Sequence, residues 1–291
     1  MINSIYLPLR VILLLLFLCV SAAANGRVET VQFQSKLINA TLPYNVILPT
    51  DYDASRTTRY PVLYLLHGLT GHYSDWVTRT NIANYASQYR MIVVTPEGND
   101  SWYVDKYETY ILQELIPDVQ KRFRTIEARY GRSIAGLSMG GYGAIKFGLK
   151  SPFTFVFAGS MSGAFSITRL SEEQVRRAGW GDSYTVFGAE DGETRLGNDL
   201  FALIEKLTPA RAASLPYFYF DCGTEDSPLI FPSNRELSAL MYEKKIAHEF
   251  RQLPGDHSWA YWDRQVQEVL KIAASKMRVR PAKTPVRVSR A

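Results

Sequence analysis

Cysteine is scarce in this chain, with two residues among 291. One of them, Cys19, lies in a hydrophobic segment near the N-terminus, and removal of that segment would leave Cys222 alone. A single cysteine cannot close an intramolecular disulfide, which excludes the class of small secreted domains held together by disulfides. Hydrophobic residues (46%) and charged residues (21%) occur at globular levels, so a largely disordered or fibrous chain is also excluded.

A hydrophobic run long enough to span a bilayer is also missing. Residues 11–20 read VILLLLFLCV, and ten residues are too few for a spanning helix. Arg10 precedes this run and Ala22-Ala23-Ala24 follows it, which is the pattern of a signal peptide cleaved before Asn25. We therefore expect residues 1–24 to be a signal peptide and the protein to be secreted or periplasmic, without stable membrane insertion after cleavage. An uncleaved anchor is the alternative.

Acidic residues are absent from the C-terminal segment 276–291, which contains six Lys or Arg residues. Without this segment the formal charge of +5 becomes −1, so the folded part is close to neutral. A near-neutral fold gives little support to a basic nucleic-acid-binding face, and we expect no nucleic-acid partner. The segment is expected to be a disordered, solvated tail, with contact to anionic polymers or lipid as the alternative.

Short apolar segments alternate with segments of helical spacing along most of the chain. Strands are predicted at 31–36, 42–48, 61–66, 91–95, 133–136, 154–159, 217–222 and 247–253. Helices are predicted at 107–123, where Pro117 should kink or restart the helix, and at 142–149, 233–245 and 258–276. This alternation predicts an α/β fold with a mostly parallel central sheet flanked by helices, in one catalytic domain over residues 25–275.

Residues 166–207 break this alternation. The segment is polar and contains glycine, with isolated aromatic residues at Trp180, Tyr184 and Phe187. About 40 residues rarely form a core of their own, so a second domain is not expected. We predict a lid-like insertion between two strands.

A G-x-S-x-G pentapeptide, Gly136-Leu-Ser-Met-Gly140, lies between a predicted strand and a predicted helix. This context is typical of a nucleophile elbow, a tight turn in which glycines leave room for an exposed serine. The pattern predicts Ser138 as a nucleophile and the amide of Met139, at the helix N-terminus, as a donor to an oxyanion. Cys222 is a rival nucleophile, but it ends an apolar strand and is expected to be buried.

A serine nucleophile needs a base, and the chain has four histidines. His67 and His72 lie in or beside the loop after the strand at 61–66, and His248 lies within the last predicted strand. His257 lies in the loop between the last strand and the last helix. The order serine, acid, histidine found in α/β-hydrolases selects His257.

The acid should follow a late strand and precede His257. Asp221-Cys-Gly-Thr-Glu-Asp226 offers three carboxylates, of which Asp221 is still in the strand. Asp226 is favoured over Glu225 because it lies directly before Ser227-Pro228, where the chain turns into the next element.

The second oxyanion donor should come from the loop after the strand at 61–66. His67-Gly-Leu-Thr-Gly71 occupies this loop, and the amide of Leu69 is the first choice, with Gly68 next. A zinc site built from His67 and His72 is the competing interpretation, and it lacks a third ligand at a recognisable spacing.

These motifs resemble those of the esterase D-type α/β-hydrolases. The resemblance rests on His67-Gly-Leu-Thr-Gly71, Gly136-Leu-Ser-Met-Gly-Gly-Tyr-Gly143, Cys222-Gly-Thr-Glu-Asp226 and Gly255-Asp-His257 with Trp259 and Trp262. It covers residues from about 41 to about 272 and includes a loop at 96–105. The group contains S-formylglutathione hydrolases, bacterial tributyrin esterases and, more distantly, mycolyltransferases and feruloyl esterases, and the tributyrin esterases look most similar.

The resemblance implies an α/β-hydrolase fold with nucleophile, acid and base at Ser138, Asp226 and His257, and oxyanion amides at Leu69 and Met139. Two features depart from the formylglutathione hydrolases. The chain has no cysteine between Leu69 and Trp76, and it begins with a signal sequence, whereas those enzymes are cytosolic.

The sequence therefore predicts a secreted or periplasmic serine carboxylesterase that acts on small-molecule esters through an acyl-enzyme, without metal or organic cofactor. Four aromatic residues are expected to line a pocket for a short or aromatic acyl group: Trp102, Tyr103, Trp180 and Trp259. The alternatives are a formylglutathione-type thioesterase, an acyltransferase to a sugar, and a binding protein on a hydrolase scaffold. A homo-oligomer is left open.

Overall fold

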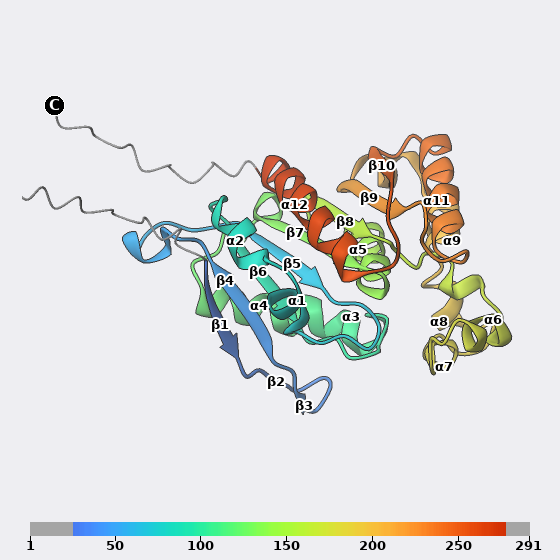
Figure 1. Ribbon diagram of the computed structural model, residues 1–291, viewed down its shortest axis with the longest axis horizontal. Coiled ribbons are helices and arrows are strands. Elements are labelled where there is room, and N and C mark those ends of the chain that lie inside the picture. Colours follow the sequence, from blue (N-terminus) through green and yellow to red (C-terminus); the bar gives the residue numbers. More distant parts are fainter. Residues whose placement is uncertain (1–25, 278–291) are drawn as a thin grey trace, which may run out of the picture.

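The computed structural model describes residues 26–277, and its centre is a sheet of eight strands in the order β1-β4-β6-β5-β7-β8-β9-β10 (Figure 1). Strand β4 is antiparallel to both neighbours, and the other five pairings are parallel, which confirms the predicted mostly parallel sheet. The strands are β1 (Arg27–Val31), β4 (Tyr44–Leu48), β5 (Val62–Leu66), β6 (Ile92–Pro96), β7 (Arg132–Leu137), β8 (Phe157–Met161), β9 (Tyr217–Gly223) and β10 (His248–Leu253).

Helices cover both faces of the sheet and separate two hydrophobic clusters. On β5, Leu63 and Leu65 face one cluster, whereas Tyr64 and Leu66 face the other. A central strand that is buried on both faces must be apolar at every position, which explains the continuous run in the sequence. The first cluster is covered by α1 (Asp75–Arg79), α2 (Ile82–Ser87) and α12 (Trp259–Lys276), and the second by α5 (Met139–Lys150), α9 (Leu200–Glu205), α11 (Phe231–Glu243) and the helical segment 106–122.

The helical segment 106–122 was expected to kink or restart at Pro117, but it is continuous, and its hydrogen-bonding pattern changes just before that proline. Helix α3 (Lys106–Tyr110) continues into a π-helical turn, η2 (Ile111–Leu115), and then into α4 (Ile116–Arg122). Pro117 lies in the first turn of α4, where its missing N–H removes no intrahelical bond of that helix.

Residues 166–207 form a series of short helices: η4 (Ile167–Arg169), α6 (Glu172–Arg177), α7 (Ser183–Val186), α8 (Glu193–Leu196) and α9. Figure 1 shows α6, α7 and α8 together at one end of the molecule. Arg195 is 3% exposed and donates to the carbonyls of Thr168 (3.3 Å), Tyr184 (3.0 Å) and Gly188 (2.9 Å). A buried guanidinium with five donors can hold several carbonyls that a short helix leaves unpaired, so this insertion is organised around a polar centre.

The N-terminal region differs from the prediction. A strand was expected at 31–36, but β1 ends at Val31. Within the expected range, Gln34–Ser35 forms a short strand, β2, which pairs with Ala40–Thr41 (β3) in a separate two-stranded sheet. The pairing of Arg27 with Leu48 sets the register of β1, and β1 is an edge strand with mostly exposed side chains. Its hydrophobic alternation is therefore weak, which misled the sequence interpretation.

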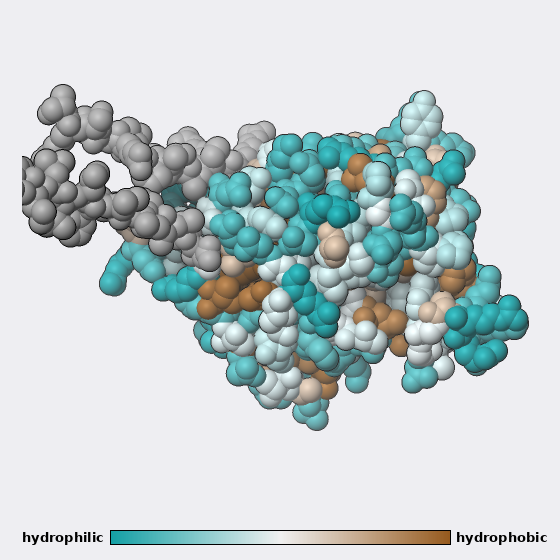
Figure 2. Space-filling model, in the orientation of Figure 1, coloured by the Kyte–Doolittle hydropathy of each residue, from teal (hydrophilic) through white to brown (hydrophobic). Residues whose placement is uncertain are grey.

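The two chain ends fall mostly outside the described residues. The predicted signal peptide, 1–24, lies outside them entirely. The basic tail was expected from residue 276, but Lys276 still belongs to α12 and Met277 is 3% exposed, so a tail can begin only after residue 277. Within residues 26–277, no helix is both long and apolar enough to cross a membrane. On the face drawn in Figure 2, hydrophobic residues gather in small separate patches among polar ones.

The loop before β9 contains one more helix that the sequence analysis missed, α10 (Pro209–Ala213). Thr208 caps it by accepting from the Arg211 amide, and Pro209 occupies its first position. Thr-Pro is a common helix start, so this signal was present in the sequence.

Candidate active site

The polar residues of the candidate site come from the carboxyl ends of five strands. Segments 67–71, 97–105 and Ser138 follow β5, β6 and β7, and Asp226 and His257 follow β9 and β10. Because parallel strands end at the same edge of a sheet, the chain brings these distant segments together there.

Ser138 occupies the turn between β7 and α5 with φ 52° and ψ −114°, a left-handed conformation that a serine rarely adopts. The turn leaves no room for side chains at its two glycines. A Cβ at Gly136 would lie 2.5 Å from the Gly140 backbone, and one at Gly140 would lie 2.5 Å from the His67 carbonyl oxygen. The amide of Ser138 donates to the Met161 carbonyl of β8 (2.9 Å), which helps to hold the strained residue in place.

A chain of hydrogen bonds links Ser138, His257 and Asp226. His257 Nε2 lies 3.0 Å from Ser138 Oγ, and His257 Nδ1 lies 3.0 Å from Asp226 Oδ1. The Asp226 carboxylate is buried and also accepts the amide of Ser227 (2.6 Å). Burial opposes its ionisation, but the hydrogen bond and charge of His257 outweigh burial and lower the pKa of Asp226. The rings of Trp262 and His257 pack edge to face, with 4.9 Å between their centroids, and this contact limits rotation of the imidazole.

The other two carboxylates of the segment 221–226 do not reach His257. Glu225 is exposed and takes part through its backbone amide, which donates to the Gly255 carbonyl (2.9 Å). Asp221 is fully buried in β9 and accepts from the Tyr261 hydroxyl (2.8 Å), and burial raises the pKa of Asp221 to about 7. The geometry therefore favours Asp226 as the partner of the imidazole.

Cys222 is buried, as predicted, with its Sγ 3.7 Å from Asp226 Oδ2. Burial and the neighbouring Asp226 charge raise the pKa of the thiol, which disfavours the thiolate that a nucleophile requires. His248 stacks on Phe220, with Nε2 3.0 Å from Ser238 Oγ and Nδ1 2.8 Å from the Ile246 carbonyl. These contacts indicate structural roles for Cys222 and His248.

Two backbone amides near Ser138 have no hydrogen-bond partner among the described residues. Among the hydrogen bonds of residues 26–277, none uses the amide of Leu69 or of Met139 as a donor. Met139 is the first residue of α5, where the amides of a helix are free to bind an anion. Gly68, Leu69 and Ser138 line the same cavity, so the Leu69 loop and the serine share one space.

That cavity has a volume of about 490 Å³. Its walls include three of the four aromatic residues expected in the pocket: Trp102, Trp180 and Trp259. A second cavity of about 430 Å³ also borders Trp180 and His257 and has a more apolar wall at Pro228, Leu229 and Ile230.

Tyr103 does not line either cavity, which corrects the expectation for this residue. It is fully buried, with its hydroxyl donating to the His67 carbonyl (3.1 Å) and its ring against Gly98 and Gly143. Trp102 and Tyr103 both have φ near +54° (53° and 54°), and this irregular backbone directs one side chain to the cavity and the next into the core. Phe187 is likewise buried, lines neither cavity and packs against Trp102, with 5.8 Å between the ring centroids.

A buried lysine supports this irregular loop, and the sequence analysis missed it. Lys146 is completely buried in α5 and donates to the Tyr103 carbonyl (2.5 Å) and to Glu108 (2.7 Å). Burial lowers the pKa of Lys146 to about 8, although Glu108 favours its charged form. In the sequence, Lys146 is the single charged residue of the segment 142–149, and this was the signal that could have identified it.

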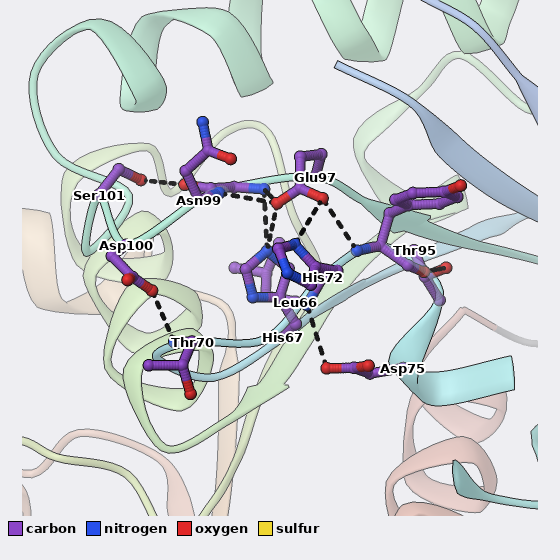
Figure 3. A network of polar contacts seen from close by, with 12 residues as sticks. Leu66, His67, Thr70, His72, Asp75, Thr95, Glu97, Asn99, Asp100 and Ser101 are labelled. Carbon is purple, nitrogen blue, oxygen red and sulfur yellow. Dashed lines mark hydrogen bonds and ion pairs between the residues drawn. The ribbon is translucent and has the colours of Figure 1, made fainter. Parts of the chain in front are cut away.

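A second missed network surrounds His67, as Figure 3 shows. His67 is 1% exposed, and its Nε2 accepts the Gly98 amide (2.9 Å) and lies 3.2 Å from Glu97 Oε1. Glu97 Oε2 lies 3.4 Å from Nδ1 of the exposed His72. Burial opposes ionisation of Glu97, but His67 and the amides of Asn99 and Tyr73 outweigh it and lower the pKa of Glu97 to about 2.

His67 and His72 thus both face Glu97, and the His67 nitrogens are engaged with backbone groups. Within residues 26–277, no cluster of three or more His, Cys, Asp or Glu side chains has a geometry that could hold a metal ion. The described residues therefore give the zinc interpretation no support.

Comparisons with known proteins agree with this architecture. Residues 35–271 match the model of the Esterase family. An acetyl esterase of Caldicellulosiruptor saccharolyticus is 29% identical over 252 residues, which cover 81% of this chain and 94% of that protein. Among solved structures, a ferulic acid esterase superposes with a TM-score of 0.75 at 26% identity, covering 87% of this chain and 100% of the other.

The S-formylglutathione hydrolase FrmB of Staphylococcus aureus superposes with a TM-score of 0.70 at 27% identity, covering 86% of this chain and 99% of the other. The family match extends over most of the chain and includes all five strand ends that form the site. This protein therefore belongs to the Esterase family and is a carboxylic ester hydrolase with an α/β-hydrolase fold.

Proposed function

We propose that the protein is an exported serine carboxylesterase in which Ser138, His257 and Asp226 form a catalytic triad. The observation that carries the proposal is the hydrogen-bond chain from Ser138 Oγ through the imidazole to the buried carboxylate, at the wall of a cavity large enough for a small ester. The lowered pKa of Asp226 supports its role, because an ionised acid stabilises the imidazolium that forms during attack.

In the proposed mechanism, His257 Nε2 takes the proton of Ser138 as Oγ attacks the ester carbonyl. The carbonyl oxygen becomes an oxyanion that accepts from the amides of Leu69 and Met139, each worth about 3 kcal/mol in such sites. The imidazolium returns its proton to the departing alcohol, which leaves an acyl-enzyme. A water then attacks this ester, with His257 again acting first as base and then as acid.

The proposed substrates are esters of short-chain or aromatic acids. The cavity wall is rich in indole rings, at Trp102, Trp180 and Trp259, and apolar surfaces of this kind bind an acyl chain or a flat ring. The acetyl and ferulic acid esterases among its relatives point to the same two acyl classes. The likeness to FrmB keeps an S-acyl thioester as the second candidate, although no cysteine follows the Leu69 loop before Trp76.

Export is proposed from the signal-like residues 1–24 alone. Expression of the full chain in a bacterial host, followed by fractionation and N-terminal mass spectrometry, tests it. A protein that begins at Asn25 in the periplasm or medium would support export, whereas an intact N-terminus in the cytosol would refute it.

The esterase proposal is tested with Ser138→Ala and a substrate panel. The panel covers p-nitrophenyl esters from acetyl to octanoyl, a feruloyl ester, an acetylated sugar and an S-acyl thioester. Ser138→Ala should abolish hydrolysis and fluorophosphonate labelling, while Cys222→Ala should keep most of both. Retention of more than about 1% of activity in Ser138→Ala would refute the nucleophile, because loss of a triad member removes several orders of magnitude. A preference for the thioester over all oxygen esters would favour the second candidate, and acyl transfer to an added sugar would reveal a transferase.

A further inference from the structure

The carbonyl oxygen of Gly68 is held by two donors. His67 Nδ1 lies 2.7 Å from it, and the Gly71 amide donates to it at 3.1 Å. A carbonyl oxygen cannot donate, so Nδ1 must carry the proton in this contact.

The same peptide unit contains the amide of Leu69, the proposed oxyanion donor. In a trans peptide the C=O and the following N–H point in opposite directions, and residues 26–277 contain no cis peptide. Fixing the Gly68 oxygen against the His67 ring therefore also fixes the direction of the Leu69 N–H, away from the ring. Leu69 lines the cavity that Ser138 also lines, so an acyl oxygen bound beside the serine lies in the space that this loop borders.

The His67 ring is itself held rigidly. Its Nε2 accepts the Gly98 amide (2.9 Å), and Glu97 lies beside it at 3.2 Å (Figure 3). The Tyr103 hydroxyl donates to the His67 backbone carbonyl (3.1 Å), so the loop after β6 holds both the ring and the backbone of this residue. The His67 side chain is 1% exposed, so bulk solvent is shielded from these contacts.

We propose that His67 is a positioning residue that aims the Leu69 amide at the oxyanion, with the imidazole acting as a fixed bridge between the loops after β5 and β6. The inference rests on the proposed esterase function, since it assigns a task within that site. His67 touches no reacting atom, and its effect passes through the peptide between Gly68 and Leu69.

The test compares His67→Asn with His67→Leu. The two side chains branch identically at Cγ and have nearly the same size, but only asparagine places an N–H donor at the position of Nδ1. We expect His67→Leu to lower kcat for p-nitrophenyl butyrate by roughly 10- to 100-fold, with KM changed less than about threefold, because a misdirected oxyanion donor acts mainly on the transition state. His67→Asn should remain within about fivefold of the wild-type kcat.

A boronic acid provides the second measurement, since it forms a tetrahedral adduct with a serine nucleophile that places an oxygen in the oxyanion hole. Its affinity should fall in His67→Leu by about the same factor as kcat/KM, and much less in His67→Asn. A merely structural role would change thermal stability without this parallel loss. Equal kcat values in folded His67→Leu and His67→Asn would overturn the proposal, as would an unchanged boronate affinity in His67→Leu.

If His67→Leu does not fold, as judged by circular dichroism, His67→Gln replaces it. Its amide reaches the position of Nε2 rather than that of Nδ1, so it should lose activity as the leucine variant would, and activity equal to that of His67→Asn would overturn the proposal. Failure of the esterase function itself would be visible separately, as absence of Ser138-dependent hydrolysis in the wild-type protein.

Discussion

Replacement of Asp226 by asparagine should reduce turnover strongly without altering the fold. Both carboxylate oxygens lie near His257 Nδ1, Oδ1 at 3.0 Å and Oδ2 at 3.2 Å, and Oδ1 also accepts the Ser227 amide at 2.6 Å. In Asp226→Asn, the amide oxygen can satisfy the Ser227 amide, but the NH₂ group then competes for the imidazole and favours the tautomer with a bare Nδ1. That tautomer carries its proton on Nε2 and cannot accept the proton of Ser138.

The size of the effect follows from the two tasks that the substitution removes. A wrong tautomer and an unstabilised imidazolium together cost about 10⁴-fold in kcat in a comparable serine hydrolase triad, which corresponds to about 5.5 kcal/mol of transition-state stabilisation. Because Asp226 is buried, solvent cannot take over either task. KM should change little, since neither task involves the bound ground state.

The assay is steady-state hydrolysis of p-nitrophenyl butyrate between pH 6 and 9, with Glu225→Gln as the matched control. Glu225 is the adjacent carboxylate, is exposed, and makes no side-chain contact with His257 among the described residues. Its neutralisation should leave kcat within about twofold, because an exposed charge contributes little. A loss below tenfold in Asp226→Asn, or a larger loss in Glu225→Gln, would refute the assignment of the acid.

Three further changes have definite expected outcomes. Trp180→Ala should raise KM and shift acyl preference across acetyl to octanoyl esters while fluorophosphonate labelling of Ser138 persists, because Trp180 borders both cavities; an unchanged acyl profile would make the insertion a peripheral loop. Lys146→Met should lower the free energy of unfolding in urea by about 3 kcal/mol, since it removes the donor to the buried Tyr103 carbonyl and the buried cation beside Glu108. Lys150→Met, whose side chain is 30% exposed, should cost less than about 1 kcal/mol. The pKa of Glu97 is lowered from 4.5 to about 2 in the folded protein, so its ionised carboxylate contributes about 3 kcal/mol to the free energy of unfolding above pH 4.5, and this contribution is lost as the pH falls toward 2. Glu97→Gln should therefore make the free energy of unfolding less dependent on pH over that range. A pH dependence equal to that of the wild-type protein would contradict the assignment.

Strands β4 to β10 of the central sheet and the main site residues were predictable because their signals are local. The run at 61–66 is apolar at each position since β5 is covered on both faces, and the glycines around Ser138 mark a turn that admits no side chain. Asp226 and His257 could be chosen from their order along the chain, and the structure brings both within hydrogen-bond distance of one another.

The supporting contacts were not predictable, because they join segments far apart in the sequence. Lys146 donates to the carbonyl of Tyr103, which lies 43 positions away in the sequence, and the Gly98 amide donates to His67, which lies 31 positions away. Tyr103 has an aromatic side chain next to Trp102, and only the backbone conformation decides which of the two reaches the cavity. Composition and periodicity contain no information on such backbone choices.

Backbone strain in this molecule is concentrated where the site is built. Of the nine non-glycine residues with positive φ among residues 26–277, seven lie in segments that follow β5, β6, β7 and β8: Thr70, Asn99, Trp102, Tyr103, Asp105, Ser138 and Ser162. Each such residue costs of order 1–3 kcal/mol and persists only where its surroundings determine its conformation. Here the surroundings are polar contacts from other segments: Asp100 accepts the Thr70 amide, Lys146 donates to the Tyr103 carbonyl, and the amides of Tyr142 and Ala164 donate to the Ser138 carbonyl. These intramolecular contacts offset the strain and hold the turns that carry Ser138, Leu69 and Trp102 in place.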